Sequence, residues 1–249
     1  AVLTADDMPE IPPNSRSTLL LARDRVMFVG HPIALVLADS EAAAQDAADQ
    51  VFFDAEPIAA VVDLDAAMQS DAQAVWPEGM PGQSAEAAAH GADGAAGSAG
   101  AQAGSPNIAN RVEFPRGDLE AGFAAADVVL ERSFDTAAVH QAYIEPHAVL
   151  AEIDPTGLEA QLWTNTQATF YVRDTVAGVL GMPNTAVRVV GTPVGGGFGG
   201  KFLLYEPMMA LAARIVGRPV RHVMSRYEEM VTANPAPATR VEVKLGATK

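Results

Sequence analysis

The stretch VGGGFGGKF at residues 194–202 constrains the fold more than any other part of the chain, because five of the six residues from 195 to 200 are glycine. Glycine loses more conformational entropy on folding than any other residue, so such a run indicates that the backbone must come close to another group. A predicted strand at 186–191 precedes the run and a predicted apolar helix at 205–217 follows it. In this arrangement the backbone N–H groups of the loop can face an anion. The loop is therefore a candidate ligand-binding site.

Three interpretations of the loop follow from the residues alone. Gly195 to Lys201 fit the phosphate-loop pattern G-x-x-x-x-G-K, but Phe202 stands where that loop needs a Ser or Thr hydroxyl for Mg²⁺. No apolar strand ending in Asp follows to complete a magnesium site. A purely structural glycine turn is the second interpretation. The third is a different ligand, with one side chain, that of Phe198, placed at the centre of the loop.

The composition limits the chemistry that this chain can carry. Its 249 residues suffice for one large or two modest domains. The absence of cysteine excludes disulfides, thiolate metal sites and a Cys nucleophile, so any iron–sulfur cluster would be on another chain. It is compatible with the reducing cytosol, and we expect a cytoplasmic protein. The periplasm stays open, because residue 1 does not look like a natural N-terminus.

Charge is distributed unevenly along the chain. The net charge is −15, and the segment from Val26 to Asn110 holds twelve Asp and Glu but no Lys or Arg. Such a surface repels nucleic acids and anionic membranes and favours solubility or docking to a basic partner. No apolar run approaches the roughly 20 residues of a membrane span. We therefore expect no nucleic-acid partner and no membrane span.

The first 63 residues predict a small α/β domain. Ser40 can cap a helix whose first turn contains Glu41. The other predicted elements are strands at 1–4, 33–38, 51–54 and 58–62. Residues 64–110 are predicted to form a linker, of which 78–106 are low-complexity and rich in Ala, Gly and Ser. That segment cannot bury enough apolar surface to offset its ordering entropy, so we predict a flexible loop.

Residues 111–249 predict a second, mixed α/β domain, which makes the whole chain α+β. Asp154 to Gly157 form a DPTG turn between two strands, and Gly181 can end a helix that begins near Thr166. The remaining predicted elements are a helix from Asp118, strands at 128–134, 219–225 and 239–246, and a short helix at 226–231. The terminal strands have no evident partner in the sequence, so we expect truncated domains at both ends.

Several stretches in order carry a resemblance to a known family. GTPVGGGFGGKF at 191–202 resembles the signature loop of the molybdenum-binding large subunit in the xanthine dehydrogenase / aldehyde oxidoreductase family. VGHPIALVLADSEAAAQDAADQV at 29–51 resembles its hammerhead domain. HQAYIEPHAVLAEID at 140–154 and RPVRHVMSRYEEM at 218–230 resemble parts of its first molybdopterin domain. The resemblance implies a partial hammerhead domain at 1–63 and an incomplete molybdopterin-binding domain at 111–249.

The resemblance also implies a molybdenum–molybdopterin cofactor, with the cytosine dinucleotide form as one option. Gln167 would lie close to the molybdenum ligands, and Phe198 would present its backbone N–H to an oxo ligand. Neither would be a direct side-chain ligand of the metal. Gly196, Gly197 and Gly199 would let the pterin and the metal approach the backbone.

The resemblance gives expectations about substrate and partners as well. Phe202 stands where purine-oxidising members of the family have a Glu, so we expect an aldehyde or aromatic heterocycle as substrate. A plain core role for Phe202 is the alternative. Water would supply the oxygen, and electrons would pass to iron–sulfur and FAD subunits. The remainder of the large subunit, including the catalytic Glu, would be outside this chain. A catalytically inert truncated scaffold is the rival hypothesis.

Two other groups of polar residues need an interpretation. Glu145 is predicted to order nearby backbone or loops rather than to act as a general base. His140 and His147 do not have the spacing of a zinc pair. The stretch SRYEEM, with Arg226, Glu228 and Glu229, is predicted to form a surface or inter-domain ion network.

Overall fold

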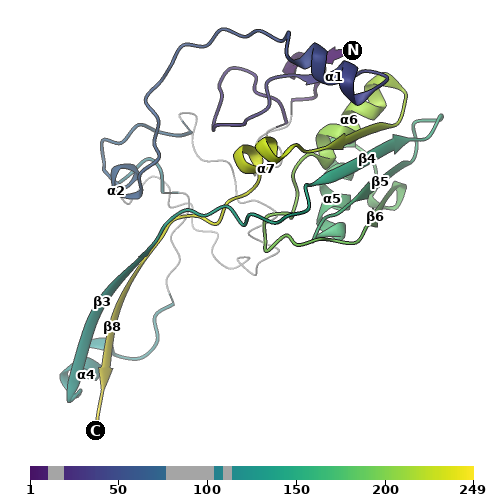
Figure 1. Cartoon of the computed structure of the whole chain (residues 1–249). Helices are drawn as coiled ribbons and strands as arrows, with labels where there is room; N and C mark the ends of the chain where they lie inside the picture. Colours follow the sequence, from purple (N-terminus) through teal and green to yellow (C-terminus); the bar gives the residue numbers. More distant parts are fainter. Residues whose placement is uncertain (11–19, 77–103, 109–113) are drawn as a thin grey trace. The chain divides into compact units, whose positions relative to one another are not determined.

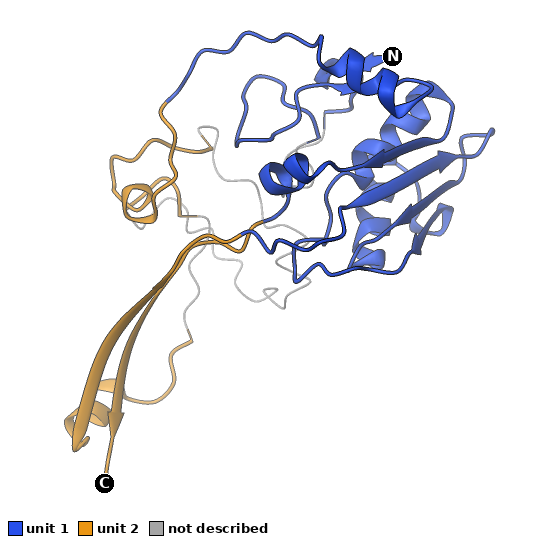
Figure 2. Ribbon diagram, in the orientation of Figure 1, with its two compact units in different colours: residues 1–58, 81–89, 140–234 blue, residues 59–80, 90–139, 235–249 orange. Residues whose placement is uncertain are grey.

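The computed structural model describes residues 1–10, 20–76, 104–108 and 114–249. Two compact units divide the chain (Figure 2): one holds residues 1–58, 81–89 and 140–234, and the other holds 59–80, 90–139 and 235–249. Each unit is therefore built from separate sequence segments, and the predicted boundaries at 63 and 110 stay a prediction. The mixture of helices and strands is the expected α+β class. In the described part of the chain, no helix has both the length and the apolar character needed to cross a membrane.

A four-stranded mixed sheet forms the centre of the first unit, in the order β6-β5-β4-β7 (Figure 1). The DPTG turn joins β4 and β5 as an antiparallel hairpin, as predicted. β5 and β6 are parallel, and helix α5 connects them in the chain. The bounds are β4 Ala148–Ile153, β5 Ala160–Thr164, α5 Thr169–Leu180, β6 Val187–Gly191, α6 Glu206–Val216 and β7 Val220–Val223. A short 3-10 helix, η3 Asn184–Ala186, leads into β6.

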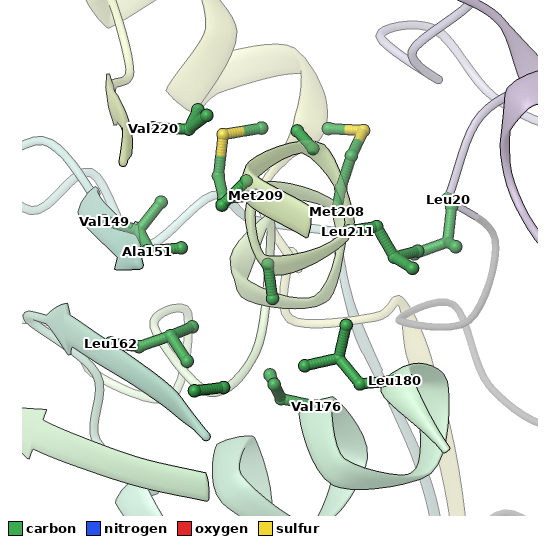
Figure 3. Close-up of a cluster of buried hydrophobic side chains, with 14 of the residues drawn as sticks. Leu20, Val149, Ala151, Leu162, Val176, Leu180, Met208, Met209, Leu211 and Val220 are labelled. Carbon is green, nitrogen blue, oxygen red and sulfur yellow. The ribbon is translucent and has the colours of Figure 1, made fainter. Parts of the chain in front are cut away.

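The core of this unit lies between the sheet and helices α5 and α6. Figure 3 shows Met209 and Leu211 of α6 in the upper part of this core, above Leu162 of the sheet and Leu180 of α5. Alternate residues of β4 and β5 face this core, as expected of a sheet with one covered face. Gly181 ends α5 in the left-handed conformation that a helix-ending glycine adopts most easily. Val172, Val176 and Leu180 of α5 are buried in this core, whereas Phe170 of the same helix is exposed.

The N-terminal segment contributes to the same core. Leu3, Met8 and Leu20 are buried in it, and β1 Val2–Leu3 pairs antiparallel with β2 Leu35–Val36. A single 3-10 turn, η1 Ala5–Asp7, follows β1. The expectation that the first strand lacks a partner is therefore wrong. Helix α1, Glu41–Ala48, begins after Ser40, whose side chain accepts a hydrogen bond from Ala43 N, as predicted.

The predicted strands at 51–54 and 58–62 do not form. Both segments are irregular, and most of their apolar side chains are exposed, including Phe52 and Val62. A strand needs a partner for its backbone N–H and C=O groups, and a short apolar run does not reveal whether one is present. Helix α2, Leu64–Ala67, follows, capped by Asp63. The low-complexity prediction at 78–106 falls almost wholly outside the described residues.

The second unit is built on a long two-stranded ribbon. β3 Val128–Thr136 pairs antiparallel with β8 Thr239–Ala247 along nine residues, so the expectation that the last strand has no partner is wrong. One face of the ribbon carries the ion pair of Glu131 and Lys244, whose carboxylate oxygen and ammonium nitrogen are 2.6 Å apart. Helix α4, Leu119–Ala124, begins at Asp118 as predicted, and the Asp118 side chain accepts a hydrogen bond from Ala121 N.

The hairpin turn gives a first testable prediction. Asp154 accepts hydrogen bonds from Thr156, Leu158 and Glu159, and these bonds, led by that from the Thr156 hydroxyl, lower its pKa to about 2. A lowered folded-state pKa stabilises the fold above the ordinary value of 3.8, and this contribution disappears as the pH falls through 2. We expect Asp154→Asn to melt at a lower temperature than the wild type at pH 6. The difference should shrink between pH 4 and 2 in thermal denaturation followed by circular dichroism.

Candidate functional site

The candidate site lies at one edge of the four-stranded sheet. β5, β6 and β7 run in the same direction, so their carboxyl ends share this edge with the amino end of antiparallel β4. Four segments therefore meet there: residues 140–147 before β4, 165–168 after β5, 192–205 after β6, and α7 Arg226–Thr232 after β7. Ligands of open α/β sheets commonly bind beyond the carboxyl ends of the strands.

The glycine loop turns sharply beyond β6. Gly196, Phe198 and Gly199 have φ angles of 92°, 49° and 90°, a region that L side chains rarely adopt. Gly200 N donates to Gly197 O at 2.7 Å and closes the turn. The Phe198 side chain is 76% exposed, so packing of the ring does not explain its unusual backbone. A left-handed non-glycine residue at a loop tip is a form of local strain often found at functional sites.

Gln167 is held against this loop by hydrogen bonds in both directions. Its side-chain Oε1 accepts from Gly199 N at 3.0 Å and from Lys201 N at 3.4 Å, while its backbone N donates to Lys201 O at 2.8 Å. A β-carbon at Gly197 would lie 2.3 Å from this Oε1. The structure thus brings Gln167 together with Gly196, Gly197, Phe198 and Gly199, all of them predicted site residues.

The glycines are required partly by the protein itself. A β-carbon at Gly195 would collide with Glu145, and one at Gly200 would collide with Tyr143 and Gln141. Only at Gly199, among the glycines of this loop, would a β-carbon meet no atom within 4 Å. At Gly195 and Gly200, neighbouring side chains of the protein itself leave no room for a β-carbon, and at Gly197 the end of the Gln167 side chain would have to move. The role of Gly196, Gly197 and Gly199 in letting the cofactor approach stays a prediction.

Several N–H donors at the loop remain available. The backbone N–H groups of Gly196, Gly197 and Phe198 donate to no acceptor among the described residues. The Oε1 of Gln167 meets two backbone donors, so its Nε2 amide group is directed away from them and has no acceptor in the described ranges either. Such donors suit an oxo group or another electron-rich atom of a ligand.

Lys201 does not face the loop's open side. Its side chain is 0% exposed, and its Nζ lies 2.6 Å from Glu145 Oε2 and 4.7 Å from the centre of the Tyr143 ring. A phosphate loop needs this ammonium group at the nucleotide phosphates. The burial of Lys201 therefore contradicts the phosphate-loop interpretation, in agreement with the unsuitable Phe202.

Glu145 orders the loop, as predicted from sequence. Its Oε2 accepts from Gly195 N at 2.6 Å as well as from Lys201. Partial burial raises the pKa of Glu145, but the Lys201 ammonium and the Gly195 N–H lower it more, so the net pKa lies below its ordinary value. The carboxylate is therefore a poor proton acceptor at neutral pH, and a general-base role is disfavoured.

Behind the loop lies a buried polar cluster that the sequence did not reveal. The carboxylate of Glu229 on α7 accepts from the Tyr143 hydroxyl and from the backbone N–H of His147. Burial, followed by the Glu229 carboxylate, raises the pKa of the Tyr143 hydroxyl. His147 Nε2 lies 3.1 Å from Glu206 Oε1. The burial of these residues was recognisable only from contacts between distant segments.

The predicted ion network of Arg226, Glu228 and Glu229 is wrong. The Arg226 guanidinium donates to the backbone carbonyls of Tyr143 and Ile144. Glu228 and Ser225 form a capping box at the start of α7, which satisfies backbone N–H groups of the first turn. Glu229 is fully buried. Each charged side chain of this motif thus satisfies backbone or buried polar groups instead of pairing with the others.

Phe202 follows directly after the buried lysine. Its ring is half-buried and packs on Tyr171 with 4.9 Å between ring centres, and its carbonyl accepts from Thr166 Oγ1. These contacts account for an aromatic residue at this position without a ligand. They agree with the alternative in which Phe202 is structural, and they leave the substrate role a prediction.

A strained loop with available N–H donors, at the carboxyl ends of parallel strands, is typical of a ligand-binding domain. Comparison with known protein families identifies this domain. Residues 101–249 match the family described as "Molybdopterin cofactor-binding domain". Residues 1–59 match the "Aldehyde oxidase and xanthine dehydrogenase, a/b hammerhead domain". The chain belongs to the aldehyde oxidase and xanthine dehydrogenase family, as its sequence motifs indicated.

Individual relatives support the same assignment. The probable hypoxanthine oxidase of Escherichia coli strain K12 is 32% identical over 243 residues, which are 91% of this chain and 25% of that protein. The nicotinate dehydrogenase large molybdopterin subunit of Eubacterium barkeri is 28% identical over 92% of this chain and 48% of its own length. The carbon monoxide dehydrogenase of Oligotropha carboxidovorans has a similar structure, with a TM-score of 0.75 and 28% identity, over 100% of this chain and 30% of its own.

The chain covers 25% of the length of the first relative and 48% of the length of the second, so it spans about a quarter to a half of these proteins. Its loop fits the cofactor that the family binds, because donors without acceptors surround Phe198 and open space adjoins Gly199. Within the described ranges, no group of three His, Asp or Glu is arranged to hold a metal ion. The roles predicted for Gln167 and Phe198 are compatible with this, since they require no direct coordination.

Proposed function

We propose that this chain supplies the glycine loop and Gln167 to the molybdenum–pterin site of a hydroxylase large subunit. When bound, the cofactor supplies the two-electron oxidation of a substrate carbon, with water as the oxygen source. The chain's own part is to bind and orient. The Phe198 N–H and the Gln167 amide would donate to electron-rich atoms of the cofactor, and the open side of Gly199 would admit it.

The available donors carry this proposal. Backbone N–H groups are fixed in direction by the turn, and Gln167 is fixed by its bonds to Gly199 and Lys201. Donors that are already oriented need little reorganisation when a ligand binds.

The proposed substrate is an aldehyde or an aromatic heterocycle. An apolar Phe202 offers no hydrogen bond to the polar edge of a purine, and an unmatched polar edge is costly to bury. Two relatives named above are a nicotinate dehydrogenase and a probable hypoxanthine oxidase, so one name fits an aromatic heterocycle and the other a purine. A substrate panel of an aliphatic aldehyde, nicotinate and hypoxanthine distinguishes these classes. We expect the purine to be oxidised most slowly.

The remaining proposals concern partners. Without cysteine, this chain cannot hold an iron–sulfur cluster, so electrons would leave through iron–sulfur and FAD subunits. The rest of the large subunit would contribute the catalytic Glu. The acidic segment from Val26 to Asn110 would favour a basic surface on a partner. A cytoplasmic site of assembly and the cytosine dinucleotide form of the pterin are part of the same proposal.

Metal analysis tests the function directly. The chain is co-expressed with the polypeptides encoded beside it, and molybdenum and pterin are quantified in the purified complex. We expect about one molybdenum per chain, and roughly tenfold less in Gln167→Ala, because a lost outer-shell partner weakens metal sites by about ten- to a hundredfold. Gln161→Ala on β5 is the matched control. Absence of molybdenum in every pairing would favour the inert scaffold instead.

A further inference from the structure

Both ends of the glycine loop are fastened to one oxygen atom. Glu145 Oε2 accepts from Gly195 N at the start of the loop and from Lys201 Nζ at its end, each at 2.6 Å. The intervening residues contain the exposed Phe198 and the donors without acceptors. One carboxylate oxygen thus sets the distance between the two points where the loop leaves and rejoins the body of the unit.

The burial of Lys201 makes this fastening strong. Its ammonium group is wholly removed from water, and a buried charge is stable only with a partner and further hydrogen bonds. Glu145 is the partner, and the face of the Tyr143 ring offers a second, cation–π contact at 4.7 Å. Charge-assisted hydrogen bonds of this kind are stronger than neutral ones.

Tyr143 is itself held from the far side. Its hydroxyl donates to Glu229, and its ring lies so near the loop that a β-carbon at Gly200 would be 2.7 Å from Cε1. Glu229 is fixed in turn by the backbone N–H of His147. The chain of contacts therefore runs from α7 through Glu229 and Tyr143 to Lys201 and Glu145, and it ends at the loop.

We propose that Glu145 is a positioning residue: by holding Gly195 and Lys201 on one oxygen, it orients the Phe198 N–H and keeps Gln167 in place for the bound cofactor. The inference rests on the proposed function for its catalytic consequence. The fastening of the loop is independent of that function. Glu145 touches neither substrate nor reacting atoms in this role, so it acts only through the backbone.

Hydrogen–deuterium exchange of the chain by itself tests the fastening. We expect Glu145→Ala to speed the exchange of peptides covering 195–201 by about tenfold or more, since the bonds lost are charge-assisted. Glu145→Gln, which keeps an acceptor for Gly195 N, should give a smaller increase. Glu131→Ala is the matched control, because Glu131 has the same 2.6 Å contact with a lysine but belongs to the ribbon. Unchanged exchange in Glu145→Ala would overturn the proposal.

A second variant separates the loss of the loop anchor from a general loss of stability. Glu145→Ala leaves Lys201 buried without a partner, whereas the double variant Glu145→Ala/Lys201→Met removes both charges. We expect the double variant to regain much of the lost thermal stability and to keep the fast loop exchange, because the Gly195 anchor is still missing. Recovery of slow exchange together with stability would show a merely structural ion pair and contradict the positioning role.

The assembled complex tests the catalytic consequence. With Glu145→Gln we expect kcat to fall about tenfold with little change in KM, since misdirected donors weaken the transition state more than substrate binding. The molybdenum content should fall less than kcat. A normal kcat in Glu145→Gln, together with faster hydrogen–deuterium exchange of the loop, would contradict the positioning role. If the wild-type complex contains no molybdenum while the loop still responds to Glu145→Ala, the proposed function fails and the fastening stands.

Discussion

Gly197→Ala should empty the cofactor site while leaving the fold almost intact. A β-carbon at residue 197 would lie 2.3 Å from Gln167 Oε1 and 2.7 Å from its Cδ. The end of this flexible side chain can swing away, so the steric cost to the fold is small. When it does, Oε1 loses the N–H groups of Gly199 and Lys201, and the amide no longer points at the ligand. We expect at least a tenfold loss of molybdenum in the purified complex.

The stability of the same variant separates a site effect from an unfolding effect. We expect Gly197→Ala to lower the free energy of unfolding by only about 1–3 kcal/mol, the net value of the two hydrogen bonds that Gln167 Oε1 loses. Gly178→Ala is the control, because Gly178 lies inside α5 and its β-carbon would meet open space. That variant should be more stable by about 0.5–1 kcal/mol and keep its molybdenum. A Gly197→Ala complex with full molybdenum content would contradict the role assigned to Gln167.

Glu229→Ala is expected to be the most destabilising single substitution in the polar cluster. The Glu229 side chain is 0% exposed, and its two oxygens satisfy the Tyr143 hydroxyl and the His147 N–H. Removing the carboxylate leaves both donors buried without acceptors and opens a cavity. We expect a loss of about 3–5 kcal/mol in the free energy of unfolding, measured by urea denaturation.

Two further variants check the cause of this loss. Glu229→Gln keeps an acceptor in place and should lose clearly less stability than the alanine variant. Glu228→Ala removes a neighbouring carboxylate that caps α7 and lies 3.8 Å from His222 Nε2, so it should cost about 1 kcal/mol. If both alanine variants lost the same free energy of unfolding, the loss would be due to the start of α7 and not to the buried polar cluster.

The sequence allowed most regular elements to be predicted, because their signals are local. Ser40 and Asp118 cap their helices, Gly181 ends α5, and the DPTG turn forms its hairpin. The failures share one physical cause. The apolar runs around Phe52 and Val62 predicted strands that have no partner, while the terminal strands have partners that lie 32–34 or more than 100 residues away. Pairing is a long-range property that apolar patterning does not contain.

In the candidate site, too, local features could be predicted from the sequence and long-range contacts could not. The sequence by itself determined that a glycine turn lies between a strand and a helix and made that turn a candidate ligand site, because the freedom of glycine is a local property. Only the tertiary structure decided where Lys201 goes. Its ammonium group turns inward to Glu145, 56 residues earlier in the chain, because a buried charge must find its partner among distant segments.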